Sequence, residues 1–340
     1  MKISILGLPQ SGQQELFSIL STVKMETMLQ KPMDIHYGVC NVRDPRIDKL
    51  TEIYNPKKTT YAKIDYQLLP DFDMNSPSKS GIINELKKSD EICWVASLDT
   101  AQKSVNDFLS ELVMSDMILI EKRIEAIEKD RSKPPAAKEK DKGLMEMLKK
   151  QLDAGKPLST LVFSDEQKKE MAAYQFFTLK PFVLVINVPE DKIKDNSIAE
   201  KIKKESGYPC IQVSAKLEEE LNQLSEEDRQ SMMKELGIEE SALNKMTRMV
   251  FEGLGLISFF TVGEDEVRAW PVRRNSSAPV AGGAIHTDIA KGFIRAEMFK
   301  YADLIKEGSE AKLKELGIFY LKGKDYIVED GDILSFRFNV

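Results

Sequence analysis

The sequence is poor in the residues that build disulfide frameworks and zinc sites. Its 340 residues include only three cysteines, far apart at Cys40, Cys93 and Cys210, and two histidines. Three widely separated cysteines argue against a disulfide framework and for a reducing compartment, so a cytoplasmic location is expected. The few histidines and the absence of a Cys-x-x-Cys pair argue against a zinc site, and no metal ligands are expected.

Long apolar runs are also missing. No stretch approaches the ~20 residues of a membrane-spanning helix, and the apolar segment at the N-terminus is too short for a secretory signal. A membrane partner is therefore not expected. With 42% hydrophobic and 31% charged residues the chain is typical of globular proteins, and its length favours two or three domains. A net charge of −6 means that a nucleic-acid partner would need a local basic face.

Short apolar runs separated by helical stretches predict an α/β fold. Such runs occur at 2–6, 61–69, 91–98, 182–188 and 210–213. Near-continuous apolar strands that alternate with helices are typical of a mostly parallel sheet with helices on both faces.

The middle of the chain has a different pattern. Apolar residues at steps of three and four predict a long helix over 105–130, and a second charged helix over 136–154 follows the break at 131–135. Two helices around one Pro-Pro turn favour an antiparallel hairpin that projects from the sheet domain, although ordinary covering helices give the same pattern. A helical stretch is then predicted from Ser225 to about Gly253, and short apolar runs after Gly255 predict a small α+β domain.

Residues 7–14 have the two glycines of the phosphate-binding loop pattern, Gly7 and Gly12, between a strand and a helix. The residues that handle charge have changed: Gln13 stands at the lysine position and Gln14 at the magnesium-binding hydroxyl position, with Glu15 next. A unit charge pair at ~4 Å contributes ~4 kcal/mol at an effective dielectric near 20, so triphosphate affinity should fall by orders of magnitude. Three interpretations stay open: a loop that only turns the chain, residual nucleotide binding, or binding of another small anion.

Several longer segments resemble the YchF family, the Obg-related P-loop NTPases with an inserted helical hairpin and a C-terminal TGS domain. The resemblance covers essentially the whole chain. Its most specific segments are 44–50, 177–181, 187–191, 266–270, 285–296 and 323–332. The resemblance implies a P-loop GTPase-like domain at 1–103 and 157–255, an inserted coiled-coil hairpin at 104–156, and a TGS-like β-grasp domain at 256–340.

The family's nucleotide residues carry over unevenly. Its Asp-x-x-Gly motif falls on 68–71, where Leu-Leu-Pro-Asp has neither residue in place, and the glycine-rich switch that follows is reduced to 73–81. The region of the family's proposed hydrolytic histidine contains no histidine. The resemblance therefore implies that the catalytic residues are missing.

The base-binding end matches the family better. Asn187 and Glu190 match its Asn-x-x-Glu, and Ser214, Ala215 and Lys216 match the loop beside the base. The candidate nucleotide-binding residues are Gly7, Gly12, Gln13, Gln14, Asn187, Glu190, Ser214, Ala215 and Lys216. Asn and Ser also cap strand ends and turns in any protein, so a purely structural role of Asn187 and Ser214 stays open.

Two hypotheses of function follow. In the first, the protein is a YchF-like pseudo-NTPase and scaffold that contacts the ribosome, RNA or a protein through its hairpin and TGS-like domain, and binds ATP or GTP weakly and without magnesium. In the second, it is a divergent ATP- or GTP-binding NTPase. A basic face for RNA would comprise Arg268, Arg273, Arg274, Lys291 and Arg295, but acidic residues are about as frequent there.

Overall fold

The computed structural model describes residues 1–21, 23–77, 79–132, 134–238 and 240–339. The chain folds as two compact units, one formed by residues 1–38 and 66–242 and the other by residues 39–65 and 243–340. Segment 39–65 thus groups with the C-terminal residues, while the three-domain division expected from the sequence stays a prediction. No described helix combines the length and apolarity needed to cross a membrane.

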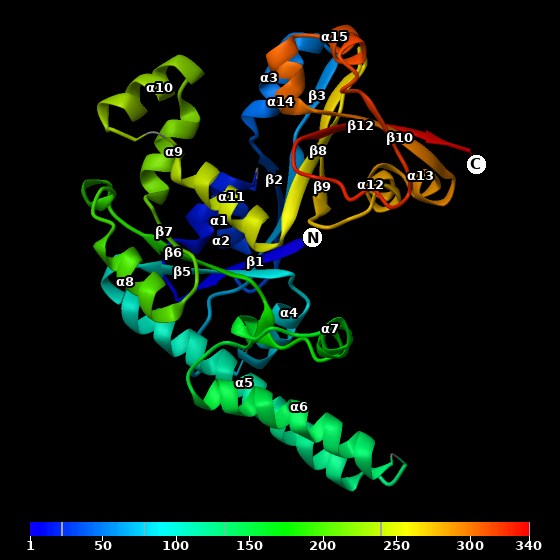
Figure 1. Cartoon of the computed structure of the whole chain (residues 1–340). Helices are drawn as coiled ribbons and strands as arrows, with labels where there is room; N and C mark the ends of the chain where they lie inside the picture. Colours follow the sequence, from blue (N-terminus) through cyan, green and yellow to red (C-terminus); the bar gives the residue numbers. More distant parts are fainter. Residues whose placement is uncertain (22, 78, 133, 239, 340) are drawn as a thin grey trace. The chain divides into compact units, whose positions relative to one another are not determined.

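A six-stranded sheet forms the centre of the first unit, in the order β2-β4-β1-β5-β6-β7 (Figure 1). Strands β1, β5, β6 and β7 run parallel. The strands are β1 (Lys2–Gly7), β2 (His36–Val42), β4 (Ala62–Leu68), β5 (Glu91–Ser97), β6 (Phe182–Asn187) and β7 (Cys210–Val213). The predicted parallel α/β fold is confirmed, because the buried strands are apolar almost throughout their length.

The helices of this unit are α1 (Gln13–Leu20), α2 (Met25–Gln30), α4 (Lys79–Lys87), α5 (Ala101–Lys129), α6 (Pro135–Asp153), α7 (Asp165–Ala172), α8 (Ser197–Ser206), α9 (Ala215–Gln223) and α10 (Glu226–Glu235). Helix α5 is fixed to the sheet by aromatic stacking: the rings of Trp94 on β5 and Phe108 on α5 lie 3.9 Å apart between centroids. Both rings are fully buried. The aromatic pair therefore anchors the first third of a 29-residue helix.

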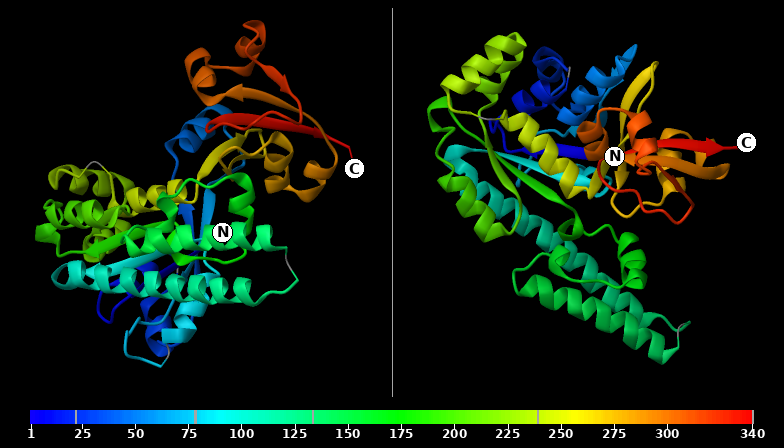
Figure 2. Two further views of the ribbon diagram at one scale, coloured as in Figure 1. Left: turned by 60° about the horizontal axis from the view of Figure 1, so that its bottom comes forward. Right: turned by 45° about the horizontal axis from the view of Figure 1, so that its top comes forward.

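The predicted two-helix hairpin is present. Helices α5 and α6 lie side by side in both views of Figure 2, and an apolar cluster that includes Ile120, Ile127, Met145 and Leu148 joins them. Pro135 begins α6, so the Pro-Pro pair turns the chain as expected. Lys133, within that break, lies outside the described residues.

The helical stretch predicted from Ser225 towards Gly253 is wrong in one respect. Ser225 caps α10 as expected, but α10 ends at Glu235 and a separate helix, α11 (Ala242–Gly253), follows. Gly237 has a φ of +65°, in the left-handed region that ends helices. Glycine is the poorest helix former after proline, so the break falls at Gly237 although the flanking segments favour helix.

One buried carboxylate explains the family segment at 177–181. Asp116 of α5, which is 2% exposed, accepts hydrogen bonds from the backbone N–H groups of Phe177 and Thr178 at 2.9 and 2.8 Å, and from the Thr178 hydroxyl at 2.7 Å. These donors have no water within reach, because Phe177 and Thr178 are themselves buried. Asp116 therefore fixes the chain where it enters β6.

Replacing Asp116 by Ala should destabilise the protein by about 3 kcal/mol, because three buried donors lose their acceptor. Urea denaturation of the variant measures this loss. Asp107→Ala is the matched control, since Asp107 is an exposed carboxylate on the same helix and should change stability by less than about 0.5 kcal/mol. Equal losses in the two variants would show that the hydrogen bonds of Asp116 do not stabilise the fold.

The second unit contains a sheet in the order β11-β10-β12-β8-β9-β3. Its strands are β3 (Lys58–Thr60), β8 (Leu256–Thr261), β9 (Glu266–Arg273), β10 (Phe293–Lys300), β11 (Tyr320–Lys322) and β12 (Asp332–Phe338). Its helices are α3 (Pro45–Tyr54), α11 (Ala242–Gly253), α12 (Ala278–Ile285), α13 (Thr287–Lys291), α14 (Tyr301–Glu307) and α15 (Glu310–Glu315). Strand β3, about 200 residues away in sequence, pairs parallel with β9 through Lys58 and Glu266.

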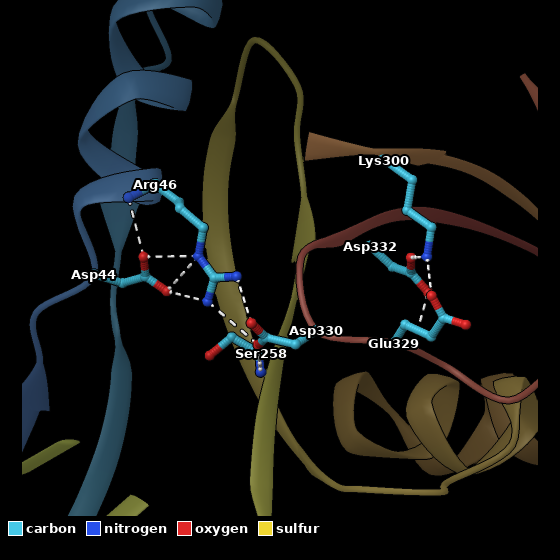
Figure 3. Close-up of polar contacts among 7 residues, drawn as sticks. All are labelled: Asp44, Arg46, Ser258, Lys300, Glu329, Asp330 and Asp332. Atoms are coloured by element: carbon cyan, nitrogen blue, oxygen red, sulfur yellow. Dashed lines mark hydrogen bonds and ion pairs between the residues drawn. The ribbon is translucent and has the colours of Figure 1, made fainter. Parts of the chain in front are cut away.

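A guanidinium group ties the early segment to the end of this unit (Figure 3). Arg46, in the first turn of α3, donates to Asp44 through Nε and Nη2 and to Asp330 through Nη1, at 3.0, 2.8 and 2.6 Å. Asp330 also accepts a hydrogen bond from the backbone N–H of Ser258 on β8 at 2.9 Å. The planar guanidinium suits two carboxylates at once, so the family segments 44–50 and 323–332 hold one another in place.

Candidate functional site

The phosphate-loop pattern adopts the conformation that its glycines allow. It connects β1 to α1, and Gly12 has a φ of +90°. A Cβ on Gly12 would overlap the side-chain amide of Asn187, and a Cβ on Gly7 would overlap the carbonyl oxygen of Val95. Both glycines are therefore required for packing, whether or not the loop holds an anion.

Gln13, at the lysine position, is directed into the protein. It is 2% exposed; its Oε1 accepts a hydrogen bond from the Ser11 hydroxyl at 2.6 Å, and its Nε2 donates to the Asp71 carboxylate. The side chain is thus committed to two partners within the chain. Gln14, at the hydroxyl position, follows as a half-buried residue of α1.

Asp71 is a site residue that the sequence analysis missed. We counted it as a mismatch at the glycine of Asp-x-x-Gly, yet it places a carboxylate at the loop. The strand order, which the sequence does not reveal, brings it there: Asp71 lies three residues beyond β4, which neighbours β1 in the sheet. Residues that follow adjacent strands at one edge of a sheet come close together.

The base-binding residues form a second cluster at the carboxyl ends of β6 and β7. The side-chain oxygen of Asn187 accepts a hydrogen bond from the N–H of Ala215 at 3.2 Å. Ser214 caps α9 by accepting from the N–H of Leu217 at 3.4 Å. The structural role weighed for Asn187 and Ser214 is therefore present, and each keeps polar atoms that this role does not use.

A cavity of about 750 Å³ lies beside this cluster. Its size is within the ~300–1,000 Å³ typical of small-molecule sites. It is lined by Glu15, Ser97, Leu98, Asp99, Asn187, Val188, Pro189, Glu190, Asp191, Ser214, Ala215, Lys216 and Glu219. The structure thus brings the five base-end residues together around one space, whereas the four phosphate-loop residues do not line it.

The cavity wall carries far more negative than positive charge. Five carboxylates line it, and the one ammonium group is that of Lys216. Lys216 lies 3.0 Å from a carboxylate oxygen of Glu190 and 3.9 Å from one of Glu220, and the hydrogen bond to Glu190 raises the pKa of Lys216. Its charge is therefore already balanced within the chain.

The residues at the loop do not fit a magnesium ion. Gln14 supplies an amide where the pattern has a hydroxyl, and the Asp71 carboxylate is engaged by Gln13. Across the described ranges, no group of three or more His, Cys, Asp or Glu side chains is arranged to hold a metal.

Comparisons with known proteins agree with one another on a single family. A family model described as "YchF-GTPase_C: Protein of unknown function (DUF933)" matches residues 256–339. The "Ribosome-binding ATPase YchF" of Bacillus subtilis is 34% identical, with 99% of this chain and 98% of that protein covered. The protein of the same name from Haemophilus ducreyi is 30% identical over 100% of this chain and 99% of its own. The solved structure of the Schizosaccharomyces pombe YchF GTPase matches with a TM-score of 0.86 and 25% identity, covering 99% of this chain and 97% of that one.

Proposed function

The chain belongs to the YchF family, and from this premise we propose that it is a pseudo-NTPase of that family that acts as a binding or scaffold protein. In this proposal it associates with the ribosome or with RNA, binds ATP or GTP weakly and without magnesium, and does not hydrolyse them. The relatives named ribosome-binding ATPases support the ribosome as partner and the cytoplasm as location.

The observation that carries the proposal is the state of Gln13. Phosphoryl transfer depends almost entirely on positioning and on stabilising the charge of the phosphates. Here the position of the cation holds a neutral amide that is bound to Ser11 and to the Asp71 carboxylate. A triphosphate at this loop would meet two carboxylates, those of Glu15 and Asp71, in place of a lysine.

We further propose that the α5–α6 hairpin and the TGS-like residues 256–340 provide the contact surfaces. The hairpin tip, over 129–142, is rich in lysine. Of the basic face considered for the C-terminal part, Arg268 stacks on the Trp270 ring, with its guanidinium carbon 3.7 Å from the ring centroid. Lysines of the hairpin tip are paired as well, Lys140 with Glu166 at 3.1 Å and Lys142 with Glu128 at 2.6 Å, so a polyanion would have to compete with internal partners at either surface.

The second candidate function is a divergent ATP- or GTP-hydrolysing enzyme. The relatives called ATPases and the cavity at the base end both favour it. It would require triphosphate binding through backbone N–H groups of the loop and through the base, because the lysine is absent.

Calorimetry with ATP, GTP, ADP and AMP, each with and without magnesium, tests the proposal. We expect no magnesium-dependent binding and no turnover, because neither the cation nor the metal ligands are in place. In a sedimentation assay with ribosomes, the fraction of the protein that pellets with them should be the same with and without ATP. Micromolar, magnesium-dependent ATP binding with turnover would support the enzyme in place of the pseudo-NTPase.

A further inference from the structure

The acidic wall of the base-end cavity restricts what can bind there. Its carboxylates come from four separate parts of the first unit: Glu15 from α1, Asp99 from the turn after β5, Glu190 and Asp191 from the turn after β6, and Glu219 from α9. Because they come from separate elements, the negative charge is spread over the lining and is not confined to one segment. The field within the cavity therefore opposes anions.

Lys216 does not offset this field. Its ammonium group is bound to Glu190 at 3.0 Å and lies 3.9 Å from Glu220. An anionic ligand could recruit this lysine only by breaking its contact with Glu190 and leaving another carboxylate without a cation. Phosphate binding through Lys216 thus replaces one ion pair with another and gains little.

The side of the cavity nearest the phosphate loop is no more favourable to an anion. Glu15 stands in the first turn of α1 and lines the cavity, so the helix N-terminus that usually attracts phosphate carries a carboxylate facing this space. Behind it, Gln13 bonds to the Asp71 carboxylate. A phosphate attached to a ligand in the cavity would therefore lie in negative potential wherever it points.

The same wall suits a neutral ligand that has hydrogen-bond donors. Carboxylates accept hydrogen bonds from amino and hydroxyl groups, and the amide of Asn187 and the hydroxyl of Ser214 add both donors and acceptors. A purine nucleoside combines an amino-substituted base with a ribose rich in hydroxyls. It carries no charge at neutral pH, and a cavity of about 750 Å³ has room for it.

We infer that this cavity binds an uncharged purine nucleoside in preference to the corresponding nucleotides. The inference rests on the proposed function, since it takes the base-end cluster to be a ligand site, and it adds the class of ligand. Affinity should fall in the order adenosine, AMP, ATP, which is the reverse of the order for a working phosphate loop. We expect at least a tenfold loss from adenosine to AMP.

Titration calorimetry with adenosine, AMP and ATP, without magnesium and at constant ionic strength, measures this order directly. The double variant Glu15→Gln/Glu219→Gln should tighten AMP binding by about tenfold relative to adenosine binding. The phosphate senses the two lost charges, whereas adenosine still meets a side-chain oxygen that accepts hydrogen bonds at each position. Both glutamates are exposed, so their replacement should leave the fold intact.

Glu227→Gln/Glu235→Gln is the matched control. It removes the same charge from exposed positions of α10 that do not line the cavity, and it should leave both affinities unchanged. Asn187→Ala should abolish adenosine binding. A melting temperature equal to that of the unmutated protein shows that the variant has lost a ligand contact and not its fold.

The outcomes separate this inference from the proposed function. If AMP binds as well as adenosine, the inference is wrong and a non-hydrolysing base-binding protein still stands. If neither nucleosides nor nucleotides bind at millimolar concentration, the cavity is no ligand site, and the scaffold role alone remains. Tight magnesium-dependent ATP binding with turnover would overturn the inference and the proposed function together.

Discussion

Replacing Glu91 by Gln should stabilise the protein, and the gain should grow by about 1.4 kcal/mol for each pH unit between about pH 5 and pH 9. Glu91 begins β5 and is completely buried. Neither carboxylate oxygen has a hydrogen-bond partner within the described part of the chain. Burial disfavours the charged form and raises the pKa of Glu91 from 4.5 to about 9.

The direction of the effect follows from proton binding. Between pH 4.5 and 9 the folded protein holds a proton on Glu91 that the unfolded chain has released. The free energy of unfolding therefore falls as the pH rises through this range and is highest below the pKa of the unfolded chain. At pH 7 the loss amounts to about 3 kcal/mol, and Gln, which is neutral at every pH, avoids it.

Urea denaturation of the unmutated protein and of Glu91→Gln at pH 5, 6, 7 and 8 measures the difference. The two should be almost equally stable at pH 5, where a protonated carboxyl and an amide are similar neutral groups. Glu139→Gln, at an exposed position of α6, should show a constant difference across the series. Parallel profiles for Glu91→Gln and the unmutated protein would mean that Glu91 is ionised in the fold.

Restoring the phosphate loop should recover triphosphate binding only in part. The triple variant Gln13→Lys/Gln14→Ser/Glu15→Thr returns the cation and the hydroxyl and removes one carboxylate. A lysine at position 13 would find Asp71 already in place, because Asp71 accepts a hydrogen bond from the present Gln13. The restored ammonium would therefore pair with Asp71, and phosphate would have to compete for it. We expect ATP affinity to increase by about tenfold.

Adding Asp71→Asn to the triple variant should increase ATP affinity by about another tenfold, because the lysine is then free for the phosphates. Calorimetry with Mg-ATP measures both steps. Asp71→Asn in the otherwise unmutated protein is the control and should gain little, since Gln13 supplies no charge. If the triple variant alone bound Mg-ATP at micromolar concentration, Asp71 would not compete with the phosphates for the lysine at position 13.

The elements that depend on local sequence were predicted well. Strands β1, β5, β6 and β7 and helices α5 and α6 are marked by apolar periodicity, and their prolines and glycines stand at the ends. Strand β3 could not be found in this way. It has three residues, Lys58, Thr59 and Thr60, with no apolar pattern, and it is a strand only because β9 pairs with it.

The candidate site also has a part that the sequence predicts and a part that only the folded structure reveals. The sequence identified Gln13 as a replaced lysine, but it could not show that Asp71 would meet that side chain from another strand. It also named Asn187, Glu190 and Lys216 as base-end residues by family resemblance alone. That Glu15, Asp99 and Glu219 line the same cavity depends on how four separate segments pack, which no spacing in the chain encodes.

The hydrogen bonds between Arg46 and Asp330 constrain when the second unit can fold during translation. During translation, residues 39–65 emerge well before β12, the strand that lies between β10 and β8 in the sheet. The second unit therefore cannot close until β12 has also been made, and its first segment must wait in an unpaired state. A fragment that starts at residue 256 would lack both Arg46 and the edge strand β3, and would expose the side of β9 that β3 covers in the full chain.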